Sequence, residues 1–205
     1  MSLLAAVLVL AGASGSAVTN DAAISSYVTC AAGSRDAQMR TLLDTKAEED
    51  YRAAALSVND VGKCATSDAA VTAPLLAAFG SERGKFRGMV AEALLKRSTT
   101  ARTLPALPQV SSYTAGWFAL SGRPRAVDEM AMCVAATNPG GIITLLGTKP
   151  GSPWQRQALT ALTPSLGACL AKGYQLDTKP AGLRAALAEA LYHRDFYVSV
   201  PGGGS

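Results

Sequence analysis

The chain has 205 residues, a formal net charge of +4 and few aromatic residues (6%). This length allows one domain or two small ones, and so mild a charge argues against the strongly basic surface of nucleic-acid-binding proteins. One histidine and four cysteines without a Cys-x-x-Cys pair argue against a zinc site. We therefore expect no metal, no cofactor and no nucleic-acid partner.

The N-terminus has the pattern of a secretory signal peptide. An apolar run at residues 3–12 precedes a stretch of small residues, and cleavage is expected after Ala13 or Ala17. The run is too short to span a bilayer comfortably, and no cysteine stands at its end to carry a lipid anchor. We therefore predict a signal peptide at residues 1–19 of a periplasmic or secreted protein, with no stable membrane span after cleavage.

The second half of the chain repeats the first. Thr-Leu-Leu-Asp-Thr-Lys at residues 41–46 recurs as Thr-Leu-Leu-Gly-Thr-Lys at 144–149, and the block at 86–97 recurs at 183–194. Small shifts in the offset indicate a two-residue insertion in the second copy and an eight-residue insertion in the first. A motif repeated at long period indicates a duplicated unit. We predict helical repeat 1 at residues 20–97, a linker with an apolar segment at 98–123, and helical repeat 2 with a tail at 124–205.

Four cysteines in an exported chain indicate two disulfides. All three pairings respect the repeat, but a single unit before duplication could pair only its own two cysteines. We therefore predict Cys30–Cys64 and Cys133–Cys169. Each closes a loop of about 35 residues, which contributes about 3–4 kcal/mol in the loop-entropy model.

Helical signals dominate both copies. Thr45 with Glu48, and Ser152 with Gln155, have the spacing of capping boxes that start a helix. Pro164 is expected to kink or break the helix that contains it. The fold class that we predict is all-α, with two homologous disulfide-bonded helical repeats packed as one body.

Three segments depart from this helical pattern. Residues 196–200 alternate in the β manner and give the strongest strand signal. The Asn-Pro-Gly-Gly segment at 138–141 is expected to be a turn and not a phosphate loop, because no strand precedes it. In the linker, Trp117 and Leu120 belong to an apolar group that we expect to pack against one or both repeats.

Two glutamates, Glu92 and Glu189, are the only acidic residues shared by the two copies. Such a pair facing one cleft would support glycoside hydrolysis. Each glutamate, however, has a cationic partner four residues later, Lys96 or His193, so an ion pair on the helix is the favoured interpretation. His193 is the only histidine, so we predict no catalytic residue.

Four further residues are candidates for ligand binding. Arg87 and Arg184 lie at the start of the last helix of each repeat, where the helix dipole disfavours a cation, so each needs a carboxylate, helix-terminal carbonyls or an anionic ligand. Tyr51 and Trp154 occupy equivalent places in an earlier helix, where an aromatic side chain lines a groove or packs on its neighbour. We predict that an envelope protein, a peptide or an anionic ligand binds near these four residues, in a groove between the repeats.

The order of motifs in each copy also resembles a group of known sequences. A cysteine, Leu-Leu-x-Thr, a Ser/Thr-capped helix, Gly-x-Cys and Arg-x-x-(Leu/Val)-Ala-Glu-Ala-Leu follow one another in both repeats. This order resembles uncharacterised exported bacterial proteins of α-helical repeat type, which implies no activity and transfers no functional residue. We therefore expect a binding or structural module of the cell envelope rather than an enzyme, with a hydrolase using Glu92 or Glu189 as the alternative.

Overall fold

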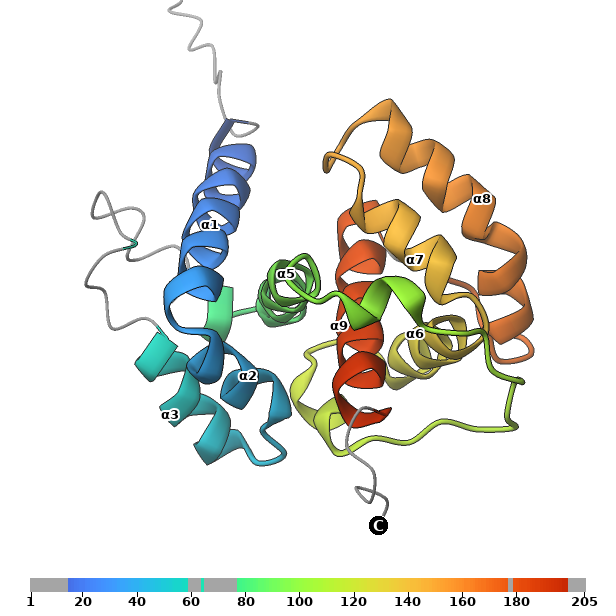
Figure 1. Cartoon of the computed structure of the whole chain (residues 1–205), viewed down its shortest axis with the longest axis horizontal. Coiled ribbons are helices and arrows are strands. Elements are labelled where there is room, and N and C mark those ends of the chain that lie inside the picture. The colour runs from blue at the N-terminus through green and yellow to red at the C-terminus, as the bar shows by residue number, and fades with distance from the viewer. Residues whose placement is uncertain (1–14, 59–63, 65–76, 177–178, 199–205) are drawn as a thin grey trace, which may run out of the picture.

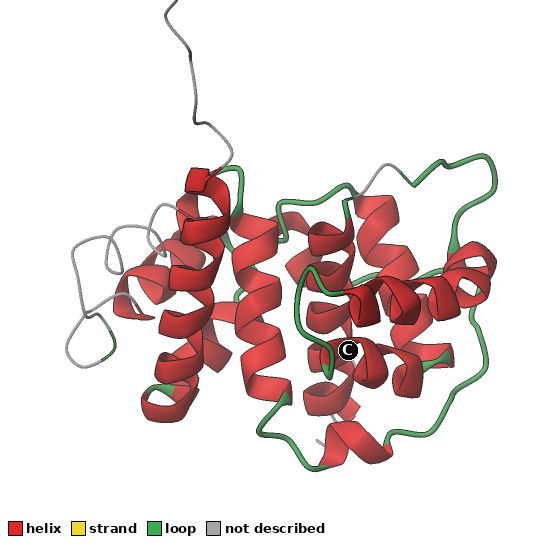
Figure 2. Cartoon of the chain, turned by 90° about the horizontal axis from the view of Figure 1, so that it is seen from above, coloured by secondary structure: helices red, strands yellow, loops and turns green. Residues whose placement is uncertain are grey.

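The computed structural model describes residues 15–58, 64, 77–176 and 179–198, without the side chains of residues 15–20, 197 and 198. These residues form α-helices, two short 3-10 helices and connecting loops, with no strand among them (Figure 2). The predicted all-α fold class is confirmed.

The helices form two groups with a pair of helices between them (Figure 1). One group contains α1 (Gly15–Ser34), α2 (Asp36–Asp44) and α3 (Glu48–Val58). The other contains α6 (Arg125–Thr137), α7 (Pro139–Leu146) and α8 (Pro153–Cys169). Between them lie α5 (Arg83–Leu95) and α9 (Pro180–Val198), and a single hydrophobic core includes residues of both groups and of the central pair.

Helices α5 and α9 cross at the centre of the molecule, where Figure 1 shows α5 end-on and α9 lengthwise. Gly88 makes this crossing close, because a Cβ atom placed on it would lie 2.3 Å from the Cα of Ala185. These two small residues stand at equivalent places in the repeated block. The block therefore provides both sides of one tight helix–helix contact.

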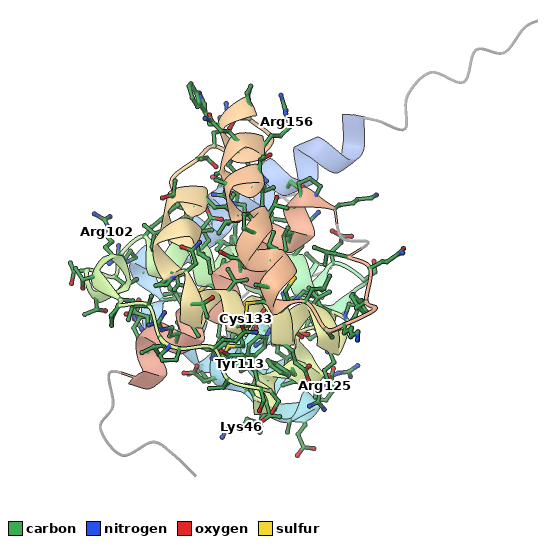
Figure 3. The ribbon with its side chains drawn as sticks, turned by 90° about the vertical axis from the view of Figure 1, so that its right-hand side faces the viewer. Lys46, Arg102, Tyr113, Arg125, Cys133 and Arg156 are labelled. Atoms are coloured by element: carbon green, nitrogen blue, oxygen red, sulfur yellow. A yellow bond between two sulfur atoms is a disulfide. The ribbon has the colours of Figure 1, made fainter. Side chains whose placement is uncertain are left out.

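Both predicted disulfides are confirmed. Cys30–Cys64 and Cys133–Cys169 each have a Cα–Cα separation of 5.6 Å, within the usual range. Figure 3 shows the Cys133 disulfide inside the second group of helices. Each bridge links the first helix of its unit to the segment that precedes the last helix.

The two predicted capping boxes have different outcomes. The Ser152 hydroxyl accepts a hydrogen bond from the Gln155 N–H and caps α8, as predicted. In the first copy α3 begins at Glu48, and the Thr45 hydroxyl instead donates to the Leu42 carbonyl at the end of α2. That predicted box was wrong, because α3 begins at Glu48, which places Thr45 two residues before the cap position at Ala47.

Helix α8 runs through Pro164 without the predicted break. Proline cannot donate to the carbonyl of Thr160, four residues earlier, but both residues are exposed, so water can satisfy that carbonyl. The Asn-Pro-Gly-Gly segment also differs from its predicted role as a turn. It begins α7, because the Asn138 side chain accepts from the Gly141 N–H.

The strand signal near the C-terminus was misleading, because α9 continues to Val198 and residues 199–200 lie outside the described residues. Phe196 packs against Tyr192 one turn earlier, with ring centroids 4.7 Å apart. The Arg40 guanidinium also lies 4.0 Å from the Phe196 ring centroid. The contact between Tyr192 and Phe196, four residues apart, thus favours a helix here despite the alternating pattern of residues 196–200.

The linker packs against the helices through its apolar segment, as expected. It contains the 3-10 helices η1 (Thr100–Thr103) and η2 (Gly116–Leu120). Trp117 and Leu120 of η2 are buried, and the Trp117 ring stacks on His193 with centroids 4.6 Å apart. The linker is therefore part of the folded body.

Helix α1 begins at Gly15, inside the segment predicted as a signal peptide, and the apolar run at 3–12 lies outside the described residues. Among the helices that the structure describes, none is by itself long and apolar enough to cross a membrane. Helices α6 and α7 taken together have the length and composition, but the pair is bent by 105°.

Candidate functional site

Reciprocal ion pairs join the two central helices. The Arg87 Nε on α5 donates to Glu189 Oε1 on α9 at 2.7 Å. The Arg184 Nε on α9 donates to Glu92 Oε2 on α5 at 2.8 Å. Each arginine therefore pairs with the glutamate of the other repeated block, the pattern of an interface with two-fold symmetry.

The same arginines also bind the repeated Leu-Leu motifs. Arg87 donates to the carbonyls of Leu42 and Leu43, at 3.1 and 2.9 Å, at the C-terminal end of α2. Arg184 donates to the carbonyls of Leu145 and Leu146, at 2.8 and 3.0 Å, at the end of α7. A cation there satisfies carbonyls that the helix leaves free and is favoured by the helix dipole.

Arg87 and Arg184 thus each bind a carboxylate and helix-terminal carbonyls, two of the three kinds of partner that the sequence predicted. What sequence reasoning missed is that the carboxylate comes from the opposite unit. A signal was present, because Arg87 and Glu92, like Arg184 and Glu189, are five residues apart. That spacing does not bring the two side chains together on one helix, so each arginine needs a carboxylate from elsewhere.

A third arginine, Arg123 at the end of the linker, extends one of the two ion pairs. Its guanidinium contacts Glu189 at 2.5 Å and Asp128 at 2.7 Å, and it donates to the Gly84 carbonyl at 2.8 Å. Asp128 also accepts a hydrogen bond from the Ser121 hydroxyl. These residues were not predicted, because neither Arg123 nor Asp128 has an equivalent of the same type in the other copy.

Burial and charge oppose each other at these carboxyl groups. Burial alone would raise the pKa of Glu189, but the charges of Arg87 and Arg123 outweigh it and hold the pKa below its usual value. The pKa of Glu92 is lowered in the same way, since hydrogen bonds and charges from Arg184 and Lys96 outweigh burial. Burial dominates only at Asp128, where it raises the pKa to about 6.

His193 is buried beside this network, with 3% of its surface exposed. Its Nε2 atom lies 3.9 Å from Glu189 Oε1, at the predicted helical spacing. Burial lowers the pKa of His193 despite the neighbouring carboxylate. The side chain therefore fills the core between α9 and Trp117, whereas the sequence had indicated a cation paired with Glu189 along the helix.

The hydrolase alternative requires one glutamate to act as a general acid with a raised pKa and to face substrate. The Glu189 side chain is fully buried, and that of Glu92 is 13% exposed. The pKa is lowered at both, so each carboxylate stays ionised and bound to arginine. This geometry gives the hydrolase no support.

The four residues predicted to bind a ligand are placed very differently. Tyr51 and Arg87 lie together, with the guanidinium 5.4 Å from the ring centroid, but both are fully buried. Arg184 is 5% exposed, whereas Trp154 is 70% exposed on α8. Of the four, only Trp154 presents most of its side chain to solvent.

The surface of the first unit has a shallow depression of about 730 Å³ between α2 and α3. Asp44, Lys46 and Asp50 are the charged residues that line it. Within the described residues, no group of His, Cys, Asp and Glu side chains could hold a metal ion. The depression thus combines opposite charges without a convergent set of ligands.

Comparisons of this chain with protein-family models, with curated proteins and with solved structures found no match.

Proposed function

We propose that the protein is an exported binding or structural module of the cell envelope, built from two duplicated helical units and without catalytic activity. Two disulfides form within a chain that begins with the pattern of a signal peptide. Disulfides persist in oxidising compartments such as the periplasm and the exterior of the cell, which supports export.

The observation that carries the proposal is the reciprocal pairing of Arg87 with Glu189 and of Arg184 with Glu92. The two arginines and two glutamates of these pairs are used inside the molecule, where they hold α5 and α9 together. This supports a rigid two-unit scaffold, related by an approximate two-fold axis, that presents its outer surfaces to a partner.

Export is tested by expressing the full chain in a bacterial host and separating the cell fractions. We expect a chain cleaved after Ala13 or Ala17 in the periplasm or medium, with no thiol that reacts with an alkylating reagent before reduction. Uncleaved protein with reactive thiols in the cytosol would overturn the proposed export.

The absence of catalysis is tested with a panel of glycoside substrates and the variant Glu92→Gln. Glu129→Gln is the matched control, because Glu129 also pairs with an arginine, Arg125 at 2.6 Å, but on the surface of α6. Hydrolysis by the wild type that Glu92→Gln abolishes and Glu129→Gln retains, with both variants folded, would establish the hydrolase instead.

A further inference from the structure

The two units differ at one equivalent pair of aromatic residues. The Tyr51 hydroxyl donates to the Ala78 carbonyl at 2.9 Å, and the Phe79 ring covers Tyr51 edge-on with centroids 6.5 Å apart. Trp154, 103 residues further along, is 70% exposed. The aromatic side chain thus belongs to the core in the first unit and lies at the surface in the second.

The turn that opens α3 buries Tyr51, whereas the turn that opens α8 buries Gln155 instead. Trp154, the neighbouring residue on that turn, therefore faces solvent. Of the large hydrophobic side chains in the described part of the chain, Trp154 is the most exposed, at 70%. An exposed indole ring is favoured at a membrane–water interface.

The charge around Trp154 is of one sign. None of the 15 acidic residues of the chain lies between Glu129 and Asp177, a stretch that contains all of α7 and α8. Lys149 and Arg156 flank Trp154 and are both exposed. Figure 3 shows Arg156 at the outer end of α8. We call residues 147–156, which join α7 to α8 and form the first turn of α8, the α7–α8 tip.

The α7–α8 tip lies at the same end of the molecule as the start of α1 (Figure 1). Helix α1 begins at Gly15, immediately after the apolar run at residues 3–12 that the sequence predicts to enter a membrane during export. Before cleavage, the tip is thus at the end of the molecule from which the chain continues toward the apolar run.

We propose that the α7–α8 tip docks on a bilayer surface that contains anionic lipid, an inference that rests on the proposed location in the cell envelope. Trp154 enters the interfacial region, where tryptophan is favoured, and Lys149 and Arg156 bind headgroup phosphates. One aromatic anchor with two basic residues gives weak, reversible binding that depends on the lipid and on salt.

The test measures binding of the purified oxidised protein to vesicles of phosphatidylglycerol mixed with phosphatidylcholine, and to vesicles of phosphatidylcholine alone. Tryptophan fluorescence reports the tip directly, because the only other tryptophan, Trp117, is 4% exposed and stacked on His193. We expect a blue shift of the emission with the anionic vesicles and its loss in high salt.

Variants of the tip separate its contribution from that of the rest of the chain. Lys149→Glu/Arg156→Glu should lower the bound fraction at least tenfold, since each basic residue near an anionic surface contributes about 1 kcal/mol and reversal adds repulsion. The matched control is Lys46→Glu/Arg52→Glu in the first unit, which changes the net charge by the same amount at two side chains that are also exposed. All proteins share one N-terminus, so any binding by that segment is common to them.

Equal binding to both kinds of vesicle, or binding that the tip and control variants change equally, would overturn the proposal. A shift produced by poly-glutamate, without vesicle binding, would assign the tip to an acidic protein partner instead. The vesicle assay does not depend on export, so its result can be separated from that of the cell-fractionation experiment. If the protein bound vesicles but stayed in the cytosol of the host, the proposed function would be overturned and the docking of the tip would stand.

Discussion

Gly88 sets the distance between the two central helices, so Gly88→Ala tests the described crossing directly. The added Cβ would lie 2.3 Å from both Cα and Cβ of Ala185 and 2.6 Å from its carbonyl oxygen. Non-bonded carbon atoms prefer separations of about 3.5–4 Å, so the helices have to move apart by about 1 Å or more. That movement lengthens both reciprocal ion pairs. Their shortest distances are 2.6 Å between Arg87 Nη2 and Glu189 Oε1, and 2.7 Å between Arg184 Nη2 and Glu92 Oε1.

The change in the free energy of unfolding is the sum of two effects of opposite sign. Alanine in place of glycine inside a helix stabilises by about 1 kcal/mol. Overpacking a close contact costs about 1–3 kcal/mol, and weakening buried ion pairs adds to that cost. We therefore expect Gly88→Ala to lower the free energy of unfolding by about 2 kcal/mol or more, which lowers the melting temperature by about 4–8 °C in a chain of this size.

Gly33→Ala is the matched control, because Gly33 also lies in a helix, α1, and an added Cβ there has no atom within 4 Å. We expect it to raise the free energy of unfolding by up to about 1 kcal/mol. The assay is urea unfolding of both oxidised proteins followed by circular dichroism at 222 nm. If Gly88→Ala proved as stable as Gly33→Ala, the close crossing and the reasoning built on it would be refuted.

Three other perturbations have defined outcomes. Glu189→Gln leaves the buried Arg87 without its carboxylate and Arg123 with Asp128 alone, and should cost about 3–5 kcal/mol in urea unfolding; a loss below about 1 kcal/mol would contradict the buried network. Because folding lowers the pKa of Glu92, its carboxylate stabilises the fold above the unfolded pKa of 4.5, and this stabilisation is lost as the pH falls through the folded pKa. Glu92→Gln should therefore reduce the pH dependence of the free energy of unfolding below pH 4.5. An unchanged pH dependence would count against the ion pair. Replacing both Cys133 and Cys169 by alanine opens a loop of 36 residues and should cost about 4 kcal/mol, and a neutral result would show that the bridge does not constrain the unfolded chain.

The sequence by itself predicted the helical fold class and the pairing of the cysteines. Helical spacing of apolar residues is a local property, and the argument from duplication restricted each cysteine to a partner in its own unit. The cap of α8 was also predictable, because Ser152 and Gln155 are three residues apart and interact within one turn. Such features depend on neighbours in the chain, which the sequence shows directly.

The sequence also indicated that Arg87 and Arg184 needed partners, but only the tertiary structure decided which ones. The glutamate within reach of Arg87 is 102 residues away, and Arg123 joins it from the linker. Cross-pairing of this kind depends on how two helices cross, which in turn depends on the absence of a side chain at Gly88. No local pattern contains that information.

Exposure, too, was decided by packing and not by residue type. Tyr51 and Trp154 occupy equivalent places and have similar side chains, yet one is fully buried and the other 70% exposed. The difference arises because the first turn of α8 buries Gln155 instead, whereas Tyr51 packs inside the first unit against Phe79. The local sequence determined which residues form helices and disulfides. The surroundings of each residue determined which charged side chains form buried ion pairs and which aromatic side chain stays exposed.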